Sequence, residues 1–152
     1  MKKLPVFLPI FAMFFLISCS GNGQIAESDM AEQINVVQVI DFHSTNRCIT
    51  CKAIEKKSLD TLTKNFKEEL ENGTITFQTI NVDDDENYAI AEEFQATGTA
   101  LFINIIVNNE SNKVDLTEFA FMRAKIGDNS FENRLTREVS KGLKKIGYGV
   151  AN

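Results

Sequence analysis

The chain has 152 residues with a formal net charge of -5, and its 16 Lys and Arg are scattered among 21 Asp and Glu. This acidic balance argues against nucleic acid as a partner, because a phosphate backbone is bound by concentrated positive charge. Without residues 1–18, which have the composition of a signal peptide, 152 minus 18 leaves 134 residues; this length suits one compact domain and excludes two ordinary ones.

Residues 1–19 have the layout of a bacterial lipoprotein signal. Lys2 and Lys3 form a basic start, and the apolar run at residues 4–17 is too short to cross a membrane as a stable helix. The segment Leu16-Ile17-Ser18-Cys19 resembles the lipobox, in which the cysteine is acylated and becomes the first mature residue. We therefore predict a signal peptide at residues 1–18 and lipidation of Cys19. The alternative is an ordinary secretory signal that ends by chance at a cysteine.

Lipidation of Cys19 implies a location in the bacterial cell envelope. Two or three acyl chains would anchor the protein to a membrane, since one chain alone binds only marginally. The Ser, Gly, Asn and Gln residues at positions 20–24 are typical of a flexible tether, which we place at residues 19–33. The expected product is a membrane-anchored lipoprotein that faces the periplasm or the exterior.

The cysteine count agrees with export. The chain has three cysteines, an odd number for an exported protein, but lipidation would remove Cys19 from the thiols. Cys48 and Cys51 then remain as a single pair, in a compartment where disulfides can persist.

The folded part begins with a predicted buried strand. Residues 36–42 form a near-continuous apolar run, as expected of a strand that is buried on both faces. From Cys51 onward, apolar side chains recur at helical spacing up to Leu70, and Asn72-Gly73 ends this helix.

The rest of the chain continues the alternation of strands and helices. The further predicted elements are a strand at residues 74–82, a short helix after the acidic residues 83–85, a strand at 101–107, a turn at 108–112, an antiparallel strand at 114–121, and a closing helix at 131–146. The order is β-α-β-α-β-β-α, which is typical of an α/β domain.

The motif Cys48-Ile49-Thr50-Cys51 lies where the first predicted strand ends and the first predicted helix begins. Two cysteines at this spacing can close a small disulfide or open to a dithiol. The helix N-terminus offers unpaired N–H groups and the positive end of its dipole, which favour a thiolate, the form that attacks disulfides. A CxxC motif in this position is typical of thioredoxin-like redox chemistry.

Several motifs coincide with this order of elements: Val39-Ile40-Asp41-Phe42 before the cysteines, Ile80-Asn81-Val82-Asp83 after the second strand, and residues 94–98 before the third. Residues 34–147 thereby resemble the thioredoxin fold, which implies a central mixed β-sheet flanked by helices. Residues 42–55, FHSTNRCITCKAIE, are similar to a subgroup of bacterial thioredoxin-like proteins, the nitrophenyl compound nitroreductase subunit ArsF family. No cofactor is expected, since no Gly-rich strand-to-helix turn is present to cradle a flavin or nicotinamide phosphate.

The thioredoxin resemblance implies roles for three residues. Cys48 matches the cysteine that attacks the partner, Cys51 the one that resolves the mixed disulfide, and Asp41 the buried carboxylate that can take the proton of the resolving thiol. Because Asp41 lies in an apolar run, where an unpaired charge is costly, we favour this role over that of a solvated strand-end residue. The implied partners are thiols and disulfides of envelope proteins, together with a membrane protein that donates electrons.

One feature of the thioredoxin family is missing. Thioredoxins place a cis-proline just before the third strand, whereas the segment here is Gly98-Thr99-Ala100-Leu101. A cis bond before alanine costs several kcal/mol, so we expect Ala100 to follow a trans peptide. Partner recognition is therefore expected to differ from that of a general thioredoxin.

Four more residues lie around the dithiol. Arg47 either stabilises the Cys48 thiolate as a modulator or is a solvent-facing loop cation. His43, the only histidine of the sequence, is either a proton carrier near the sulfurs or a packed strand-end residue. Lys52 and Glu55 are expected to be surface charges of the helix.

The main alternative to redox exchange is a metal or metalloid carrier. Cys48, Cys51 and His43 offer two thiolates and an imidazole, a soft site suited to copper(I) or trivalent arsenic. A structural zinc site is disfavoured because it needs four ligands. A third possibility is an interaction module whose disulfide is only structural, although closing so small a loop stabilises little by chain entropy.

Overall fold

The computed structural model describes residues 33–148. The predicted signal peptide at residues 1–18, the lipidation site Cys19 and the tether up to residue 32 lie outside the described residues and stay predictions. Within the described range, none of the helices combines the length and the hydropathy of a membrane-spanning segment.

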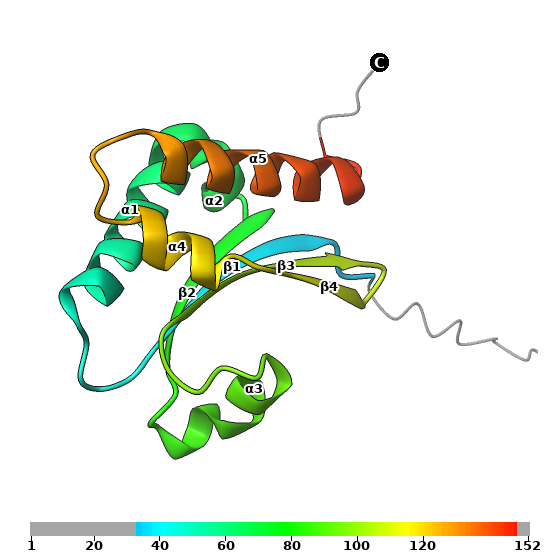
Figure 1. Cartoon of the computed structure of the whole chain (residues 1–152). Coiled ribbons are helices and arrows are strands. Elements are labelled where there is room, and N and C mark those ends of the chain that lie inside the picture. The colour runs from blue at the N-terminus through cyan, green and yellow to red at the C-terminus, as the bar shows by residue number, and fades with distance from the viewer. Residues whose placement is uncertain (1–32, 149–152) are drawn as a thin grey trace, which may run out of the picture. The chain divides into compact units, whose positions relative to one another are not determined.

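A four-stranded mixed sheet forms the centre of the domain (Figure 1). Its strands, in spatial order, are β2 (Ile75–Asn81), β1 (Val36–His43), β3 (Ala100–Val107) and β4 (Glu110–Asp115). β1 pairs with β2 in parallel, and the two other pairings are antiparallel. The predicted mixed α/β fold is confirmed, and the arrangement is consistent with a thioredoxin-like domain.

Helices cover the two faces of this sheet unequally (Figure 1). In the described part of the chain, one face carries four helices and the other a 3-10 turn followed by one short helix. On the first face lie α1 (Ile49–Asn65), α2 (Lys67–Glu71), α4 (Thr117–Arg123) and α5 (Ser130–Lys145); on the second lie η1 (Asp85–Asn87) and α3 (Tyr88–Glu93).

Buried side chains form one cluster on each face of the sheet. The larger cluster joins β1, β2 and β3 to α1, α4 and α5, and it includes Val39 of β1. The smaller cluster packs Phe42 and Phe102 against Phe94, with ring centroids 5.4 and 5.3 Å from that of Phe94. β1 contributes to both clusters, so its predicted burial on both faces is confirmed.

The closing helix α5 lies close to the sheet. Its predicted apolar stripe, from Phe131 to Leu143, is buried. Gly142 approaches the strands so closely that an added Cβ would meet Val37 Cγ2 at 3.0 Å and Ile105 Cγ1 at 3.1 Å. A glycine at this position therefore sets the distance between the helix and the sheet.

The prediction of a strand at residues 114–121 is wrong beyond Asp115. β4 ends there, and α4 follows instead. The Asp115 carboxylate accepts a hydrogen bond from Thr117 N at 2.8 Å, which turns the chain. Leu116, Ala120 and Ala124 then recur every fourth residue and are buried, as on the inner face of a helix.

The first predicted helix is divided into two. The prediction of one helix up to Leu70 is wrong at Phe66, whose φ of -141° and ψ of 39° are not helical. Phe66 is buried at this break, and Leu70 of α2 packs against the same cluster, so the two helices contribute to one core.

The hairpin between β3 and β4 is tighter than predicted. Its turn is confined to Asn108 and Asn109, whose φ angles are 52° and 69°, while Ser111 and Asn112 pair within β4. Asn tolerates this left-handed conformation better than most residues, and two such residues in a row suit a two-residue hairpin.

Candidate functional site

Cys48 and Cys51 form a disulfide at the N-terminal end of α1, with their Cα atoms 5.1 Å apart. Cys48 is the N-cap residue of this helix and is exposed, whereas Cys51 is only 6% exposed. The Cys48 sulfur accepts a hydrogen bond from Cys51 N at 3.0 Å. The two sulfurs are thus unequal, since one is open to an incoming partner and the other is protected.

The loop between β1 and α1 is fixed by side chains at the end of β2. Asp83 Oδ2 accepts a hydrogen bond from Thr45 N at 2.7 Å, and Asn81 Nδ2 donates to Thr45 Oγ1 at 3.1 Å. The first contact satisfies a backbone N–H that the loop would otherwise leave unpaired, and the second joins two side chains. They give the segment that leads into Cys48 a defined position.

Beneath the start of α1 lies a buried acid that an arginine connects to the surface. Asp41 of β1 is fully buried and shares the strand face of Val39, which packs in the cluster with α1. Asp41 Oδ2 lies 3.2 Å from Arg47 Nη2, and Arg47 Nη1 forms an ion pair with Glu55 of α1. One guanidinium, directly before Cys48 in the chain, thus bridges two carboxyl groups.

The environment of Asp41 brings its ionisation close to neutral pH. Burial raises the pKa of Asp41 to about 7, from an ordinary value of 3.8. The Arg47 guanidinium lowers this pKa and the Glu55 carboxylate raises it, but removal from water outweighs both charges. Asp41 Oδ1 has no hydrogen-bond partner among the described residues. A carboxyl group with such a pKa can serve as a proton acceptor at neutral pH.

Arg47 is not the solvent-facing loop cation of one sequence interpretation, and the other, an effect on the Cys48 thiolate, stays a prediction. Its side chain is 18% exposed, and its two terminal nitrogens contact the carboxyl groups of Asp41 and Glu55. The contacts described for residues 33–148 include none between this guanidinium and the Cys48 sulfur. Arg47 therefore joins the buried acid of β1 to the surface of α1.

Glu55 is the site residue that the sequence analysis missed, since it was expected to be an ordinary surface charge. The helical spacing contained a signal for its position. Glu55 follows Ile54 directly and lies four residues after Cys51, and both of these residues are buried. It therefore borders the buried stripe of α1, where its carboxylate reaches Arg47.

His43 ends β1 and is half-buried, with its Nδ1 3.1 Å from Ser44 O. Within residues 33–148, no group of three His, Cys, Asp or Glu side chains is arranged to hold a metal ion. The alternative copper or arsenic site at Cys48, Cys51 and His43 would need the reduced cysteines and stays a prediction.

A hollow of about 350 Å³ adjoins the site at the segment before β3. It is lined by residues 95–100, with Asp115 and Thr117 on its other side. A Cβ added at Gly98 would lie 3.6 Å from Ser44 Oγ, so this segment borders the loop that leads into Cys48. Ala100, which stands where thioredoxins have proline, lines the hollow and pairs with Phe42 of β1.

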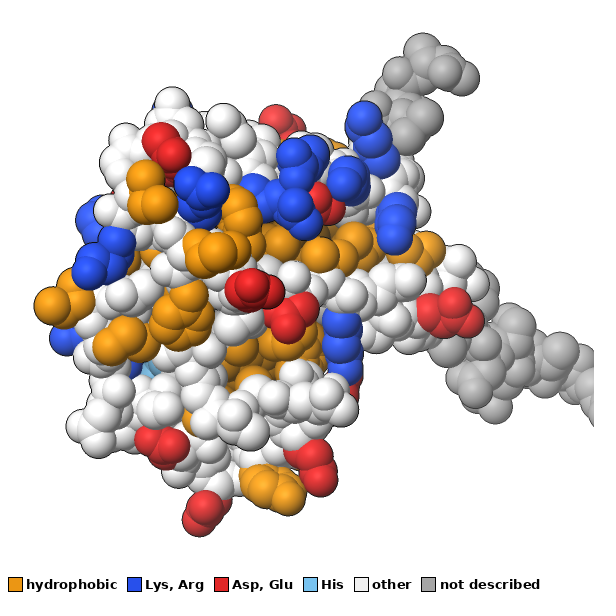
Figure 2. All heavy atoms as spheres, viewed as in Figure 1, with side chains coloured by type: hydrophobic (Ala, Val, Ile, Leu, Met, Phe, Trp, Pro, Cys, Tyr) orange, Lys and Arg blue, Asp and Glu red, His pale blue; other side chains and the backbone are white. Residues whose placement is uncertain are grey.

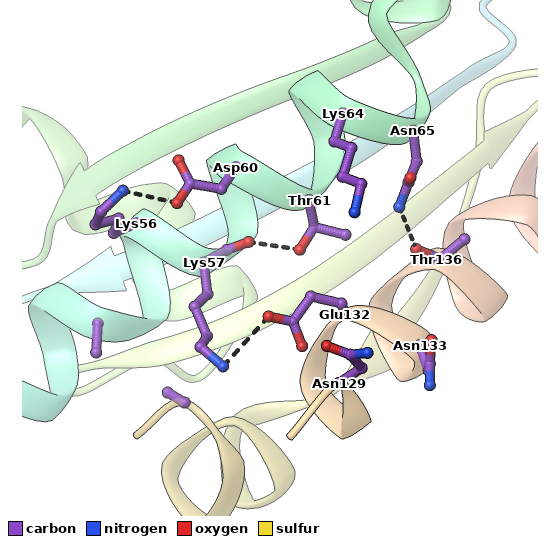
Figure 3. Close-up of a pocket in the computed structure, with 12 residues that line it drawn as sticks. Lys56, Lys57, Asp60, Thr61, Lys64, Asn65, Asn129, Glu132, Asn133 and Thr136 are labelled. Atoms are coloured by element: carbon purple, nitrogen blue, oxygen red, sulfur yellow. Dashed lines mark hydrogen bonds and ion pairs between the residues drawn. The ribbon is translucent and has the colours of Figure 1, made fainter. Parts of the chain in front are cut away.

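A larger hollow, of about 690 Å³, lies between α1 and α5 and is lined by neither cysteine (Figure 3). Many of its polar side chains pair with one another: Lys57 with Glu132 at 3.3 Å, Lys56 with Asp60 at 2.7 Å, and Asn65 with Thr136 at 2.9 Å. Figure 3 shows these pairs across the hollow and along its α1 side. Since several of its polar groups pair with each other and neither cysteine lines it, the candidate site is the disulfide.

No protein-family model matches this chain, and no curated protein sequence does. A solved structure described as "Structure of a malarial protein" is similar at 16% sequence identity and a TM-score of 0.37. The similarity covers 59% of this chain and 96% of that chain. A likeness of this degree says nothing about function, and the resemblance to the ArsF family stays a prediction.

Proposed function

We propose that this protein is a membrane-tethered thiol–disulfide oxidoreductase that exchanges the Cys48/Cys51 dithiol with disulfides of envelope proteins. The observation that carries the proposal is the inequality of the two sulfurs, with Cys48 exposed at a helix N-terminus and Cys51 buried behind it. The buried Asp41 beneath the helix start supports it further. The membrane tether rests on the sequence of residues 1–19.

In the reducing direction, the Cys48 thiolate attacks one sulfur of a partner disulfide, and the other partner sulfur leaves as a thiolate. The Cys51 thiol gives its proton to the Asp41 carboxylate. The Cys51 thiolate then attacks the Cys48 sulfur, and the bond between Cys48 and the partner breaks. The partner has gained two electrons and become a dithiol, while Cys48 and Cys51 have become a disulfide. The reverse sequence oxidises a partner instead.

Each reducing cycle leaves the protein oxidised, so a second exchange must restore the dithiol. A dithiol of an electron-donating membrane protein can do this by attacking the Cys48 sulfur, with the same atoms moving in reverse. The proposed tether would keep the domain within reach of such a donor.

The surface around Cys48 suits a polypeptide partner. Ile49, between the two cysteines, is 78% exposed, and Phe121 and Met122 of α4 are 42% and 55% exposed. Figure 2 shows apolar side chains gathered over α4 and the nearby end of α1. An exposed Ile49 directly after the reactive Cys48 favours an apolar protein segment over a small hydrophilic disulfide.

The proposal is tested by insulin reduction with the full chain in detergent, in the presence of dithiothreitol. We expect the wild type to accelerate the reaction and Cys48→Ser to be inactive. Pre-reduced Cys51→Ser, mixed with insulin after the dithiothreitol has been removed, should accumulate a mixed disulfide, because attack is retained and resolution is lost. A second measurement is the redox potential of the Cys48/Cys51 pair. A potential far below that of the envelope, with no exchange against glutathione, would contradict the proposal.

A further inference from the structure

Arg47 connects the segment that carries the attacking cysteine to the buried acid and to the surface of α1. Arg47 Nη2 lies 3.2 Å from Asp41 Oδ2, and Nη1 pairs with Glu55. The exposed fractions of the three side chains are 0% for Asp41, 18% for Arg47 and 33% for Glu55. These three side chains form a network that extends from the interior of the domain to solvent.

Burial, and not the summed charge of this network, opposes ionisation of Asp41: Arg47 lowers the pKa of Asp41, and Glu55 raises it by a smaller amount. When Asp41 is protonated, Arg47 and Glu55 form a neutral pair; when Asp41 is ionised, the three groups carry one net negative charge. Burial of a net charge is costly, which favours the protonated form. Removing Glu55 would leave the whole guanidinium charge to Asp41, whereas removing Arg47 would leave two carboxyl groups with no cation between them.

Within residues 33–148, the charged groups that act on Asp41 are Arg47 and Glu55. Its cross-strand partners are Thr79 on β2 and Leu101 on β3, which carry no charge. His43 shares its strand face two residues further along β1, and its Nδ1 contacts Ser44 O. The charges acting on Asp41 thus come from the loop, through Arg47, and from α1, through Glu55.

We propose that Arg47, held by Glu55, is a positioning residue that controls whether Asp41 is ionised, and hence the pH range in which Cys51 can resolve a mixed disulfide. This inference rests on the proposed function and adds two residues that act on the sulfurs only through Asp41. Arg47 favours the ionised, proton-accepting form, and Glu55 opposes it by sharing the guanidinium.

The two residues therefore act in opposite directions. Arg47→Gln removes the cation, so Asp41 stays protonated up to a higher pH, and resolution by Cys51 begins only at that higher pH. Glu55→Gln removes the competing carboxylate, so Asp41 ionises at lower pH, and resolution by Cys51 begins at lower pH. A merely structural role in holding the loop would weaken resolution in both variants and move neither midpoint in a particular direction.

The experiment is a single turnover of the reduced full chain in detergent with dithiobis-nitrobenzoate, followed across pH. Release of the first thionitrobenzoate reports attack by Cys48, and release of the second reports resolution by Cys51. We expect the pH midpoint of the second release to rise by about one unit or more in Arg47→Gln and to fall by a similar amount in Glu55→Gln. Arg47→Lys should restore part of the shift, because lysine keeps the charge but not the two-sided geometry.

Lys56→Gln is the matched control, since it removes a cation from α1 whose ion pair is with Asp60 and not with Asp41. It should leave the midpoint unchanged. Arg47→Gln and Glu55→Gln midpoints that move in the same direction, or that equal the control, would overturn the inference while leaving the proposed function intact. A wild type that releases no second equivalent would refute the proposed function and the inference together.

Carbon NMR of the Asp41 carboxyl group in the oxidised full chain provides a second readout that needs no turnover. The titration midpoint should be higher than wild type in Arg47→Gln and lower in Glu55→Gln. Identical midpoints in all three proteins would refute the control by Arg47.

Discussion

At the scale of single residues, Asp41 makes the stability of the oxidised protein depend on pH. The pKa of Asp41 is about 7 in the folded protein, against an ordinary value of 3.8. Between these values the folded state holds one more proton than the unfolded chain, so the free energy of unfolding falls as the pH rises. The contribution is complete below the unfolded pKa and is lost once the pH has passed the folded pKa, a difference on the order of 4 kcal/mol.

We therefore expect Asp41→Asn to abolish this slope and to be more stable than the wild type at about pH 8, because the variant buries no charge. Urea unfolding of the oxidised proteins at about pH 5 and about pH 8 measures the effect. Asp60→Asn, at an exposed position of α1, should retain the wild-type slope. An unchanged slope in Asp41→Asn would assign the pH dependence to another group.

Single residues of the site also differ in whether the sequence could predict them. Cys48, Cys51 and Asp41 were identified because their signals are local: a CxxC spacing at a strand-to-helix junction, and an acid inside an apolar run. The bridge through Arg47 to Glu55 joins a loop, a strand and a helix, and so depends on their packing. Charge type alone could not distinguish this Glu from Asp60, the other acidic residue of α1.

At the scale of elements, prediction succeeded where one periodicity was dominant. The buried run of β1 and the four-residue recurrence in α5 each fit a single type of element. The segment after Val114 fits both types of element. Val114, Leu116 and Ala120 would share one face of a strand, whereas Leu116, Ala120 and Ala124 would share one face of a helix. The capping contact of Asp115 with Thr117 and the burial of the three helical positions decide in favour of α4.

Close packing of α5 predicts the effect of a substitution at Gly142. Gly142→Ala should gain about 1 kcal/mol of helix propensity but lose about 1–3 kcal/mol by overpacking against Val37 and Ile105, so that the protein is destabilised on balance. The measurement is the urea unfolding midpoint. Asn133→Ala, exposed on the same helix, should gain propensity without the clash. A Gly142→Ala variant that is as stable as Asn133→Ala would mean that α5 shifts freely on the sheet.

At the scale of the whole molecule, the two buried clusters are formed by the sheet and its helices, and the disulfide is peripheral to both. The smaller cluster is fastened by Lys113 of β4, whose Nζ donates to Glu93 O at 2.9 Å and lies 4.2 Å from the Phe94 ring centroid. The fold thus has its own sources of stability on both faces. The proposed exchange would require this, because the protein must stay folded in both redox states.

We expect reduction to leave the protein folded and cooperative. The disulfide closes so short a loop that its chain-entropy contribution is only about 2 kcal/mol. Urea unfolding with and without dithiothreitol should therefore differ by about that amount or less, with an unchanged slope. Cys48→Ser, which cannot form the bond, should be insensitive to the reductant. Loss of a cooperative transition on reduction would instead make the disulfide a structural staple.

In the proposed exchange, the N-cap position of Cys48 would give α1 a part in the electron transfer. In the disulfide, the Cys48 sulfur is uncharged and accepts the Cys51 N–H; as a thiolate, it would place a full negative charge at the positive end of the helix dipole. Every turnover of the proposed reaction would therefore alternate α1 between a neutral and an anionic cap. The reduced and the oxidised protein would then differ along the first turn of a helix as well as at a bond, and a partner in contact with this turn would distinguish them before any sulfur reacts.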